Sequence, residues 1–249
     1  MDIVLRDNER IDDLEFNDYR IIQDTNGFCF GIDAVLLSDF ARDIRNNSVV
    51  ADLCTGTGIV SILLSGKTQA KKIYGVEIQE SVADMASRSI KLNNLEDKIS
   101  IVNDDLNNLP SSFDLGSFDA IVTNPPYMKP NSGLTNLSKE KLISRHEVMC
   151  SLEDVISVSS KLLKNNGGFY MVHRPDRLVD IMFLLRKYKL EPKVLRFVQP
   201  FVNKTPNLLL VKAVKNGNSF LKMESPLIVY NDDNSYTDEI LRIYGKERN

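Results

Sequence analysis

Short apolar segments alternate along the chain with segments of helical periodicity, and this alternation is compatible with only a few protein folds. In segment 80–94, for example, Val82, Met85, Ala86 and Ile90 recur at the spacing of one helical face. Such alternation predicts an α/β fold with a seven-stranded, mostly parallel sheet and helices on both faces. The expected strands cover 49–53, 72–76, 99–102, 118–123, 169–173, 194–198 and 208–214, and the expected helices cover 59–65, 80–94, 152–163 and 175–188.

Both flanks of this region depart from the alternation. Residues 1–30 predict an extended or hairpin lead-in, and residues 33–40 predict a helix that Asp33 could cap. The main domain is therefore expected to span residues 31–215. Residues 216–249 are expected to form a polar tail with one short strand and one helix, and the sequence does not indicate what this tail does.

Composition and charge exclude several classes of protein. The net charge of −3 rules out a uniformly basic chain, although a basic face can still occur on such a protein. No segment reaches the roughly 20 apolar residues that span a bilayer, and the acidic start does not resemble a signal peptide. Cys29, Cys54 and Cys150 are too scattered for a zinc or disulfide pattern. We therefore expect a cytoplasmic protein with no metal and no membrane partner.

The loop after the first expected strand has the composition of a cofactor site. It spans residues 52–58 (DLCTGTG) and leads into a helix. Glycines let a cofactor approach the backbone closely, and the following helix offers unpaired N–H groups. No Gly-Lys-Ser/Thr follows, so the loop is not a Walker loop. The candidate cofactor-binding residues in this loop are Asp52, Cys54, Thr55, Gly56 and Gly58.

Acidic residues end the next two expected strands. Glu77 lies roughly 20 residues beyond the glycines, where doubly wound folds place a carboxylate that accepts hydrogen bonds from ribose hydroxyls. Asp104 and Asp105 end the third strand, and one of them could accept from the amino group of an adenine. Because the carboxyl ends of parallel strands share one edge, these residues belong around one crevice. Glu77, its neighbour Ile78, and both aspartates are candidate cofactor residues.

The segment Asn124-Pro125-Pro126-Tyr127 directly follows the fourth expected strand. Its two prolines lock the backbone and remove two donors, which leaves the Asn124 side-chain oxygen and the Pro125 carbonyl as acceptors. Two acceptors and an aromatic ring suit a planar –NH₂ group, because each hydrogen can bind one oxygen while the nitrogen lone pair faces an electrophile. We predict that all four residues are catalytic and that Asn124 also borders the cofactor.

Together these segments resemble the class I methyltransferases that act on amine nitrogens of planar groups. DLCTGTG is similar to their first cofactor motif, with Cys54 where many members have glycine, and NPPY is their catalytic signature. Residues 30–37 (FGIDAVLL) resemble the GTDAVLL segment of bacterial tRNA adenine-N6 methyltransferases that modify the adenine at position 37 of valine tRNA. The resemblance covers about residues 15–215. It implies a monomeric, Rossmann-like enzyme that uses S-adenosyl-L-methionine, with Asp33 among the residues that hold the cofactor.

The resemblance implies methyl transfer to the N6 amine of adenine in RNA, with tRNA or another structured RNA as the partner. Tyr127 would stack on the target base. Basic residues outnumber acidic ones between 161 and 215, which predicts a basic sector beside the catalytic edge. The candidate RNA contacts are Arg145, Arg174 and Lys204.

Three other functions stay open at this point. Glutamine methyltransferases with protein substrates also carry NPPY, but they place a helical domain before the cofactor loop, and only about 50 residues precede that loop here. DNA adenine methyltransferases typically insert a large recognition domain, for which this chain has no room. A catalytically silent adaptor that binds cofactor or RNA would not need an intact NPPY motif.

Overall fold

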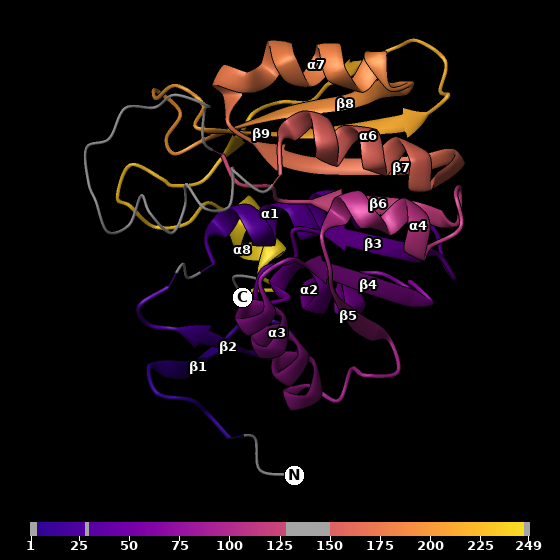
Figure 1. Cartoon of the computed structure of the whole chain (residues 1–249). Helices are drawn as coiled ribbons and strands as arrows, with labels where there is room; N and C mark the ends of the chain where they lie inside the picture. The colour runs from indigo at the N-terminus through magenta and orange to yellow at the C-terminus, as the bar shows by residue number, and fades with distance from the viewer. Residues whose placement is uncertain (1–3, 28–29, 128–149, 247–249) are drawn as a thin grey trace, which may run out of the picture.

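The structure, a computed structural model, describes residues 4–27, 30–127 and 150–246 (Figure 1). Its central sheet contains β3 (Val49–Leu53), β4 (Lys72–Glu77), β5 (Ile99–Asn103), β6 (Phe118–Thr123), β7 (Leu163–His173), β8 (Leu190–Gln199), β9 (Leu208–Lys215), β10 (Lys222–Met223) and β11 (Leu227–Ile228). The seven long strands follow the order β8-β9-β7-β6-β3-β4-β5. β3 to β7 pair in parallel, and β9 runs antiparallel to both of its neighbours. The predicted seven-stranded, mostly parallel sheet is confirmed, and β10 and β11 extend it along β8.

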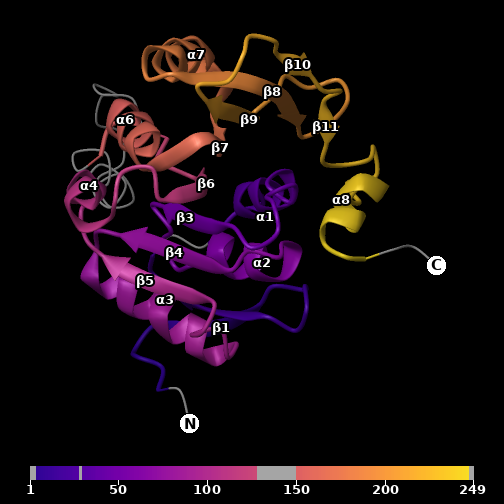
Figure 2. The same cartoon turned by 90° about the vertical axis from the view of Figure 1, so that its right-hand side faces the viewer.

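Helices cover both faces of the sheet, as Figure 2 shows from its edge. One layer contains α1 (Ile32–Phe40), α2 (Ile59–Lys67) and α3 (Glu80–Leu92); the other contains α4 (Leu109–Ser112), α6 (Leu152–Leu162) and α7 (Leu178–Lys187). Successive strand residues face opposite layers. On β6, for example, Val122 packs into the core of the first layer and Ile121 into that of the second.

The order of the strands indicates at which end of the sheet a ligand-binding site is expected. The chain passes from β3 outward to β4 and β5, and then returns to β6 on the other side of β3. In open α/β sheets, ligands bind at the carboxyl ends of the strands, beside such a reversal of strand order. We refer to the side where β3 to β8 end as the carboxyl edge. The loop that follows each of these strands lies on this edge.

The N-terminal region forms the predicted hairpin. β1 (Glu9–Asp13) and β2 (Arg20–Asp24) pair antiparallel in a separate two-stranded sheet. The hairpin packs on α3, where the Ile22 N–H donates to the Ser89 hydroxyl at 3.0 Å. Arg88 and Glu9 add an ion pair of 2.6 Å whose two side chains are largely shielded from solvent. The hairpin therefore supports the helix that follows β4.

The tail joins the sheet and the core of the domain. β10 and β11 pair with β8, and α8 (Asp238–Ile243) begins after Thr237, whose hydroxyl accepts from the Ile240 N–H at 3.4 Å. Ile240 and Ile243 are buried with residues of α1 and α2. The predicted strand and helix of the tail are both present. The domain boundary between 215 and 216 stays a prediction.

Two element boundaries differ from the sequence expectation. β7 begins at Leu163, six residues before the expected start, because the chain after α6 enters the sheet through an irregular register near Phe118. Asn166 has a left-handed φ of 61° there, which explains its turn-like composition inside a strand. The helix expected over 175–188 begins with a 3₁₀ turn (Pro175–Arg177) before α7.

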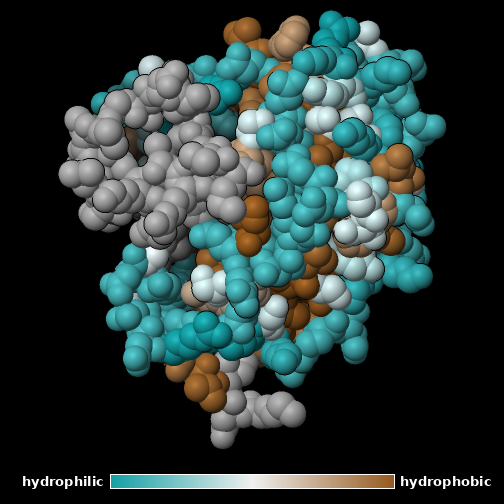
Figure 3. All heavy atoms as spheres, in the orientation of Figure 1, coloured by the Kyte–Doolittle hydropathy of each residue, from teal (hydrophilic) through white to brown (hydrophobic). Residues whose placement is uncertain are grey.

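Hydrophilic side chains cover most of the face seen in Figure 3, and hydrophobic ones show between the helices. Val179 and Phe183 on the outer side of α7 are exceptions, with 79% and 65% of their surface exposed. Within the described residues, no helix is long and apolar enough to cross a membrane.

Candidate functional site

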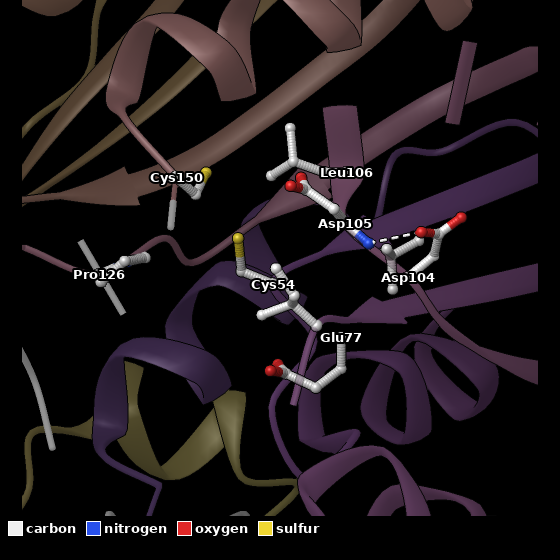
Figure 4. Close-up of a pocket in the computed structure, with 9 residues that line it drawn as sticks. Cys54, Glu77, Asp104, Asp105, Leu106, Pro126 and Cys150 are labelled. Carbon is white, nitrogen blue, oxygen red and sulfur yellow. Dashed lines mark hydrogen bonds between the residues drawn. The ribbon is translucent and has the colours of Figure 1, made fainter. Parts of the chain in front are cut away.

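A pocket opens at the carboxyl edge, among the loops that follow β3, β4, β5 and β6 (Figure 4). Nine residues line it: Cys54, Val76, Glu77, Ile78, Asp104, Asp105, Leu106, Pro126 and Cys150. Six of them were predicted from the sequence, and the other three are Val76, Leu106 and Cys150. The sequence missed Cys150, which precedes α6, because no local pattern places that residue over the β3 loop. The predicted crevice is therefore present, with three carboxylates on its walls.

The loop between β3 and α2 needs left-handed backbone at three positions. Cys54, Gly56 and Gly58 have φ values of 60°, 57° and 87°. A Cβ atom on Gly56 would meet nothing within 4 Å, so this part of the loop borders open space that a ligand can enter. Cys54 adopts its φ at a cost of roughly 1–2 kcal/mol, because it carries a Cβ. The turn thus forms although Cys54 stands at a position where many related proteins have glycine.

Asp52 lies beneath this loop and fixes its shape. The side chain is buried, and Oδ2 accepts from the hydroxyls of Thr55 at 2.6 Å and Ser61 at 2.8 Å. Oδ1 is buried without a hydrogen-bond partner among the described residues. Burial raises the pKa of Asp52 to about 6, although the two hydroxyls oppose that shift. Asp52 and Thr55 were predicted to bind the cofactor, but both lie under the loop and neither lines the pocket.

The Asp52→Asn variant is expected to change how stability depends on pH. Because the pKa of Asp52 rises from 3.8 to about 6 on folding, the folded chain binds this proton more tightly than the unfolded chain. The contribution of Asp52 to the free energy of unfolding is therefore greatest below about pH 4. It falls by up to about 3 kcal/mol as the pH rises through 6. Urea unfolding at pH 4.5, 5.5 and 7 should show Asp52→Asn gaining stability relative to wild type as the pH rises. A difference that stays constant with pH would contradict this reading of Asp52.

Glu77 joins the end of β4 to the glycine loop. Its Oε2 accepts from the Gly56 N–H at 3.1 Å, and its Oε1 accepts from the Gln79 N–H at 3.0 Å. Oε1 also accepts from the Gln79 side-chain amide at 3.2 Å, whereas Oε2 keeps a second lone pair for a ligand. A ligand that binds both oxygens therefore replaces the Gln79 amide on Oε1. Figure 4 shows the Asp105 carboxylate on the side of Cys54 and Cys150, and the Asp104 carboxylate turned away from them. Of the two aspartates, Asp105 is thus better placed to meet a ligand in the pocket.

Two thiols approach each other across the pocket. Cys54 comes from the β3 loop and Cys150 from the segment before α6, and both are unpaired cysteines. The pKa of the Cys54 thiol is raised well above its usual value by its contact with Cys150 and by burial, and nearby carboxylates add to that shift. Cys54 is therefore a neutral thiol at neutral pH.

The side chains of Asn124 and Tyr127 both contact the carboxylate of Asp33, which lies far away in the sequence. The Asn124 amide Nδ2 donates to Asp33 Oδ2 at 3.2 Å, and the Tyr127 hydroxyl approaches the same oxygen at 2.9 Å. The Tyr127 hydroxyl also contacts Asn124 Oδ1. Burial and the Asp33 carboxylate raise the pKa of Tyr127 well above its usual value, so its hydroxyl keeps its proton.

The Tyr127 ring is held by the residues that end β7. His173 packs edge-on against the ring, with centroids 5.2 Å apart, and the Arg174 guanidinium lies 5.6 Å from the ring centroid. Burial lowers the pKa of His173 to about 4, so this imidazole is neutral at neutral pH. The contact between His173 and Tyr127 was not predicted from the sequence.

The expected role of Asp33 as a helix cap is wrong. Gly31 is the N-cap residue of α1, its backbone is extended, and no side chain caps the helix. Asp33 lies in the first turn, and its Oδ1 accepts from the Ala34 N–H at 3.0 Å. The side chain faces Asn124 and Tyr127 and does not line the pocket that contains Glu77.

The basic sector is smaller than predicted. Six of the twelve basic residues between 161 and 215 form ion pairs with carboxylates; they are Lys164, Arg177, Arg186, Lys187, Arg196 and Lys212. Several of the remaining basic residues lie at the opposite edge of the sheet, where α6 and α7 end and β8 begins. Arg174 follows β7 and Lys204 follows β8, so both lie on the carboxyl edge. Arg145 is outside the described residues.

No group of three or more histidine, cysteine, aspartate or glutamate side chains with the geometry of a metal site occurs in the described part of the chain. The carboxylates around the pocket are instead engaged by backbone N–H groups and amides. Asp105 Oδ1 accepts from the Asn107 N–H at 2.9 Å, and Asp104 Oδ1 accepts from the Asn108 amide at 2.8 Å.

Comparison with known proteins identifies similar chains. The family model of the methyltransferase small domain matches residues 19–185. A tRNA1(Val) (adenine(37)-N6)-methyltransferase from Porphyromonas gingivalis is 29% identical over 204 residues, which cover 80% of this chain and 79% of the relative.

Two solved structures share the fold. A predicted O-methyltransferase from Agrobacterium tumefaciens superposes with a TM-score of 0.69 at 19% identity, covering 86% of this chain and 97% of the other. TYW2 from M. jannaschii, solved in complex with AdoMet, gives a TM-score of 0.57 at 14% identity, covering 85% of this chain and 88% of the other. The predicted Rossmann-like architecture is confirmed by these matches.

Proposed function

Because the chain belongs to the methyltransferase small domain family, we propose that it transfers a methyl group from S-adenosyl-L-methionine to the N6 amine of an adenine in tRNA. The observation that supports this most is the position of Asn124-Pro125-Pro126-Tyr127 at the end of β6, with Pro126 lining the pocket. The relatives named as tRNA adenine-N6 methyltransferases support the substrate. Position 37 of valine tRNA is the target we propose.

The residues around the pocket fit S-adenosylmethionine. Gly56 borders open space, and the carboxylates of Glu77 and Asp105 reach the same pocket. We assign Glu77 to the ribose hydroxyls and Asp105 to the adenine amino group, while Ile78 and Leu106 supply apolar contacts for the base. When bound, the cofactor supplies an electrophilic methyl group on a sulfonium.

The protein's part in the reaction is to hold the accepting amine. Asn124 Oδ1 and the Pro125 carbonyl each accept one hydrogen of the amine, and both bonds strengthen as the nitrogen becomes positive. The two prolines hold this arrangement rigid before the substrate binds. Tyr127 offers a ring to the target base, and anticodon-loop bases are less costly to unstack than bases in a duplex.

A direct assay separates this function from its alternatives. Labelled cofactor is incubated separately with total tRNA, total DNA and ribosomal proteins. We expect label in tRNA, and nuclease digestion should yield N6-methyladenosine. Label in protein glutamine instead would favour a glutamine methyltransferase, label in DNA a DNA methyltransferase, and no label in any sample an adaptor. We also propose a monomer acting in the cytoplasm, which sedimentation and cell fractionation would test.

Reversing the charges at the carboxyl edge is expected to weaken tRNA binding. Replacing Arg174 and Lys204 by Glu removes two phosphate contacts, so the slope of log affinity against log salt should fall by about two. We expect at least a roughly tenfold weaker tRNA affinity at moderate salt and an unchanged cofactor Kd.

The matched control reverses Lys161 and Lys189, two exposed lysines near the opposite edge. This variant should bind tRNA like the wild type. Equal losses in both double variants would show that net charge alone, and not the carboxyl edge, attracts the RNA. Filter binding across a salt series measures both slopes.

A further inference from the structure

A buried carboxylate on α1 contacts two of the catalytic side chains. We propose that Asp33 is a positioning residue: it fixes the Asn124 amide so that Oδ1 faces the substrate amine, and it accepts the hydrogen bond that the Tyr127 hydroxyl would otherwise donate to that oxygen. The proposal rests on the proposed function, because it assigns the amine to Asn124. It gives Asp33 no direct contact with cofactor or substrate.

The position of Asp33 suits this role. Only 8% of its surface is exposed, and Oδ1 is anchored to the Ala34 N–H at 3.0 Å. A Cβ atom on Gly31 would lie 2.8 Å from Oδ1, so glycine at the helix start leaves room for the carboxylate. Oδ2 is left to face Asn124 and Tyr127, which lie 91 and 94 residues away in the sequence.

Asp33 determines which end of the Asn124 amide faces it. A carboxylate only accepts hydrogen bonds, so the amide nitrogen of Asn124 must turn towards it and Oδ1 must point the other way. A neutral side chain at this position would not impose that orientation. With Asn at position 33, an oxygen kept on the Ala34 N–H would leave an –NH₂ group facing Asn124, and the Asn124 amide would turn over.

Asp33 also competes with Asn124 for the hydrogen bond that the Tyr127 hydroxyl donates. The hydroxyl has one hydrogen and lies within reach of two acceptors, Asp33 Oδ2 and Asn124 Oδ1. A hydrogen bond to a charged acceptor is roughly twice as strong as one to a neutral acceptor. The carboxylate therefore draws the hydroxyl hydrogen to itself and leaves Asn124 Oδ1 available for the amine.

A purely structural role for Asp33 has a different signature. An acidic residue in the first turn stabilises a helix by about 0.3–1 kcal/mol through the helix dipole. Asp238 occupies the equivalent first turn of α8, far from the catalytic motif in sequence, and is exposed. Asp238→Asn therefore serves as the control that removes a first-turn charge without touching Asn124.

A double-mutant cycle tests the coupling between Asp33 and Asn124. In single-turnover assays with tRNA, Asp33→Asn should lower the rate roughly 10- to 100-fold, with the cofactor Kd and the tRNA Kd unchanged. In the Asn124→Ala background, the same substitution should cost less than about twofold, because the residue through which it acts is gone. Equal losses in both backgrounds, or a loss matched by Asp238→Asn, would overturn the proposal.

A second measurement does not depend on the substrate. In ¹⁵N-edited NMR spectra, the Asn124 side-chain amide is the signal pair that Asn124→Ala removes. We expect one of its protons to lie downfield in the wild type and to shift upfield in Asp33→Asn, with no shift in Asp238→Asn. If the wild type methylates no tRNA, the proposed function fails while this spectrum still reports on Asp33. An unchanged amide signal in Asp33→Asn would overturn the positioning role.

Discussion

Asn124→Ala is expected to lower turnover on tRNA by roughly 10²- to 10³-fold, the loss seen when one preorganised polar partner of the reacting atoms is removed. In the proposed reaction, Asn124 Oδ1 accepts a hydrogen of the amine in the transition state, whereas the residues assigned to the cofactor lie on the loops after β3, β4 and β5. The cofactor Kd should stay within about twofold of wild type, which calorimetry measures.

The control for this variant is Asn218→Ala, which makes the same chemical change on an exposed residue of the tail. It should keep wild-type turnover. A folded Asn124→Ala enzyme that methylates tRNA at a near wild-type rate would remove Asn124 from the reaction. A large loss of cofactor affinity would instead move Asn124 into the cofactor site.

Glu77→Ala is expected to weaken S-adenosylmethionine binding by at least about 100-fold. Two charge-assisted hydrogen bonds to the ribose would be lost, each contributing about 1.5–3 kcal/mol. The substitution also frees the Gly56 N–H from its 3.1 Å bond, so the glycine loop loses a support. Glu77→Gln keeps one oxygen acceptor and should bind more tightly than Glu77→Ala.

Glu80→Ala is the matched control, because Glu80 is an exposed carboxylate three positions further along the chain. It should bind the cofactor with wild-type affinity, and thermal unfolding should show that all three variants are folded. Calorimetric Kd values that are equal for wild type and Glu77→Ala would exclude Glu77 from the cofactor site.

Local patterns were sufficient to predict the sheet and the loops at its end. Buried parallel strands appear as short apolar runs, and their order in an α/β fold brings the residues after them to one edge. Glu77 and the pair Asp104-Asp105 could therefore be placed around one pocket from spacing alone, but the choice between the two aspartates could not be made. The match of the methyltransferase small domain to residues 19–185 confirms the family resemblance drawn from the same segments.

Contacts between distant parts of the chain could not be predicted. No local signal pairs Asp33 with Asn124 across 91 residues, so the carboxylate was mistaken for a cap. The basic sector was overestimated for the same reason: a sequence lists charges without their partners. Lys212 is paired with Asp43, and Arg196 with Glu239, both from outside the segment in which the basic residues were counted.

The contact between α8 and the first helices affects when α1 can complete its packing during synthesis. The Lys67 ammonium at the end of α2 donates to the Ile243 carbonyl at 2.6 Å, and Ile240 is buried beside α1. The helix that carries Asp33 thus completes its packing only after residues 238–243 have been made. The long stretch of chain between α2 and α8 loses conformational entropy when its two ends come together, before their contact stabilises the fold. A nascent chain that still lacks α8 therefore holds Asp33 on a helix whose packing is incomplete.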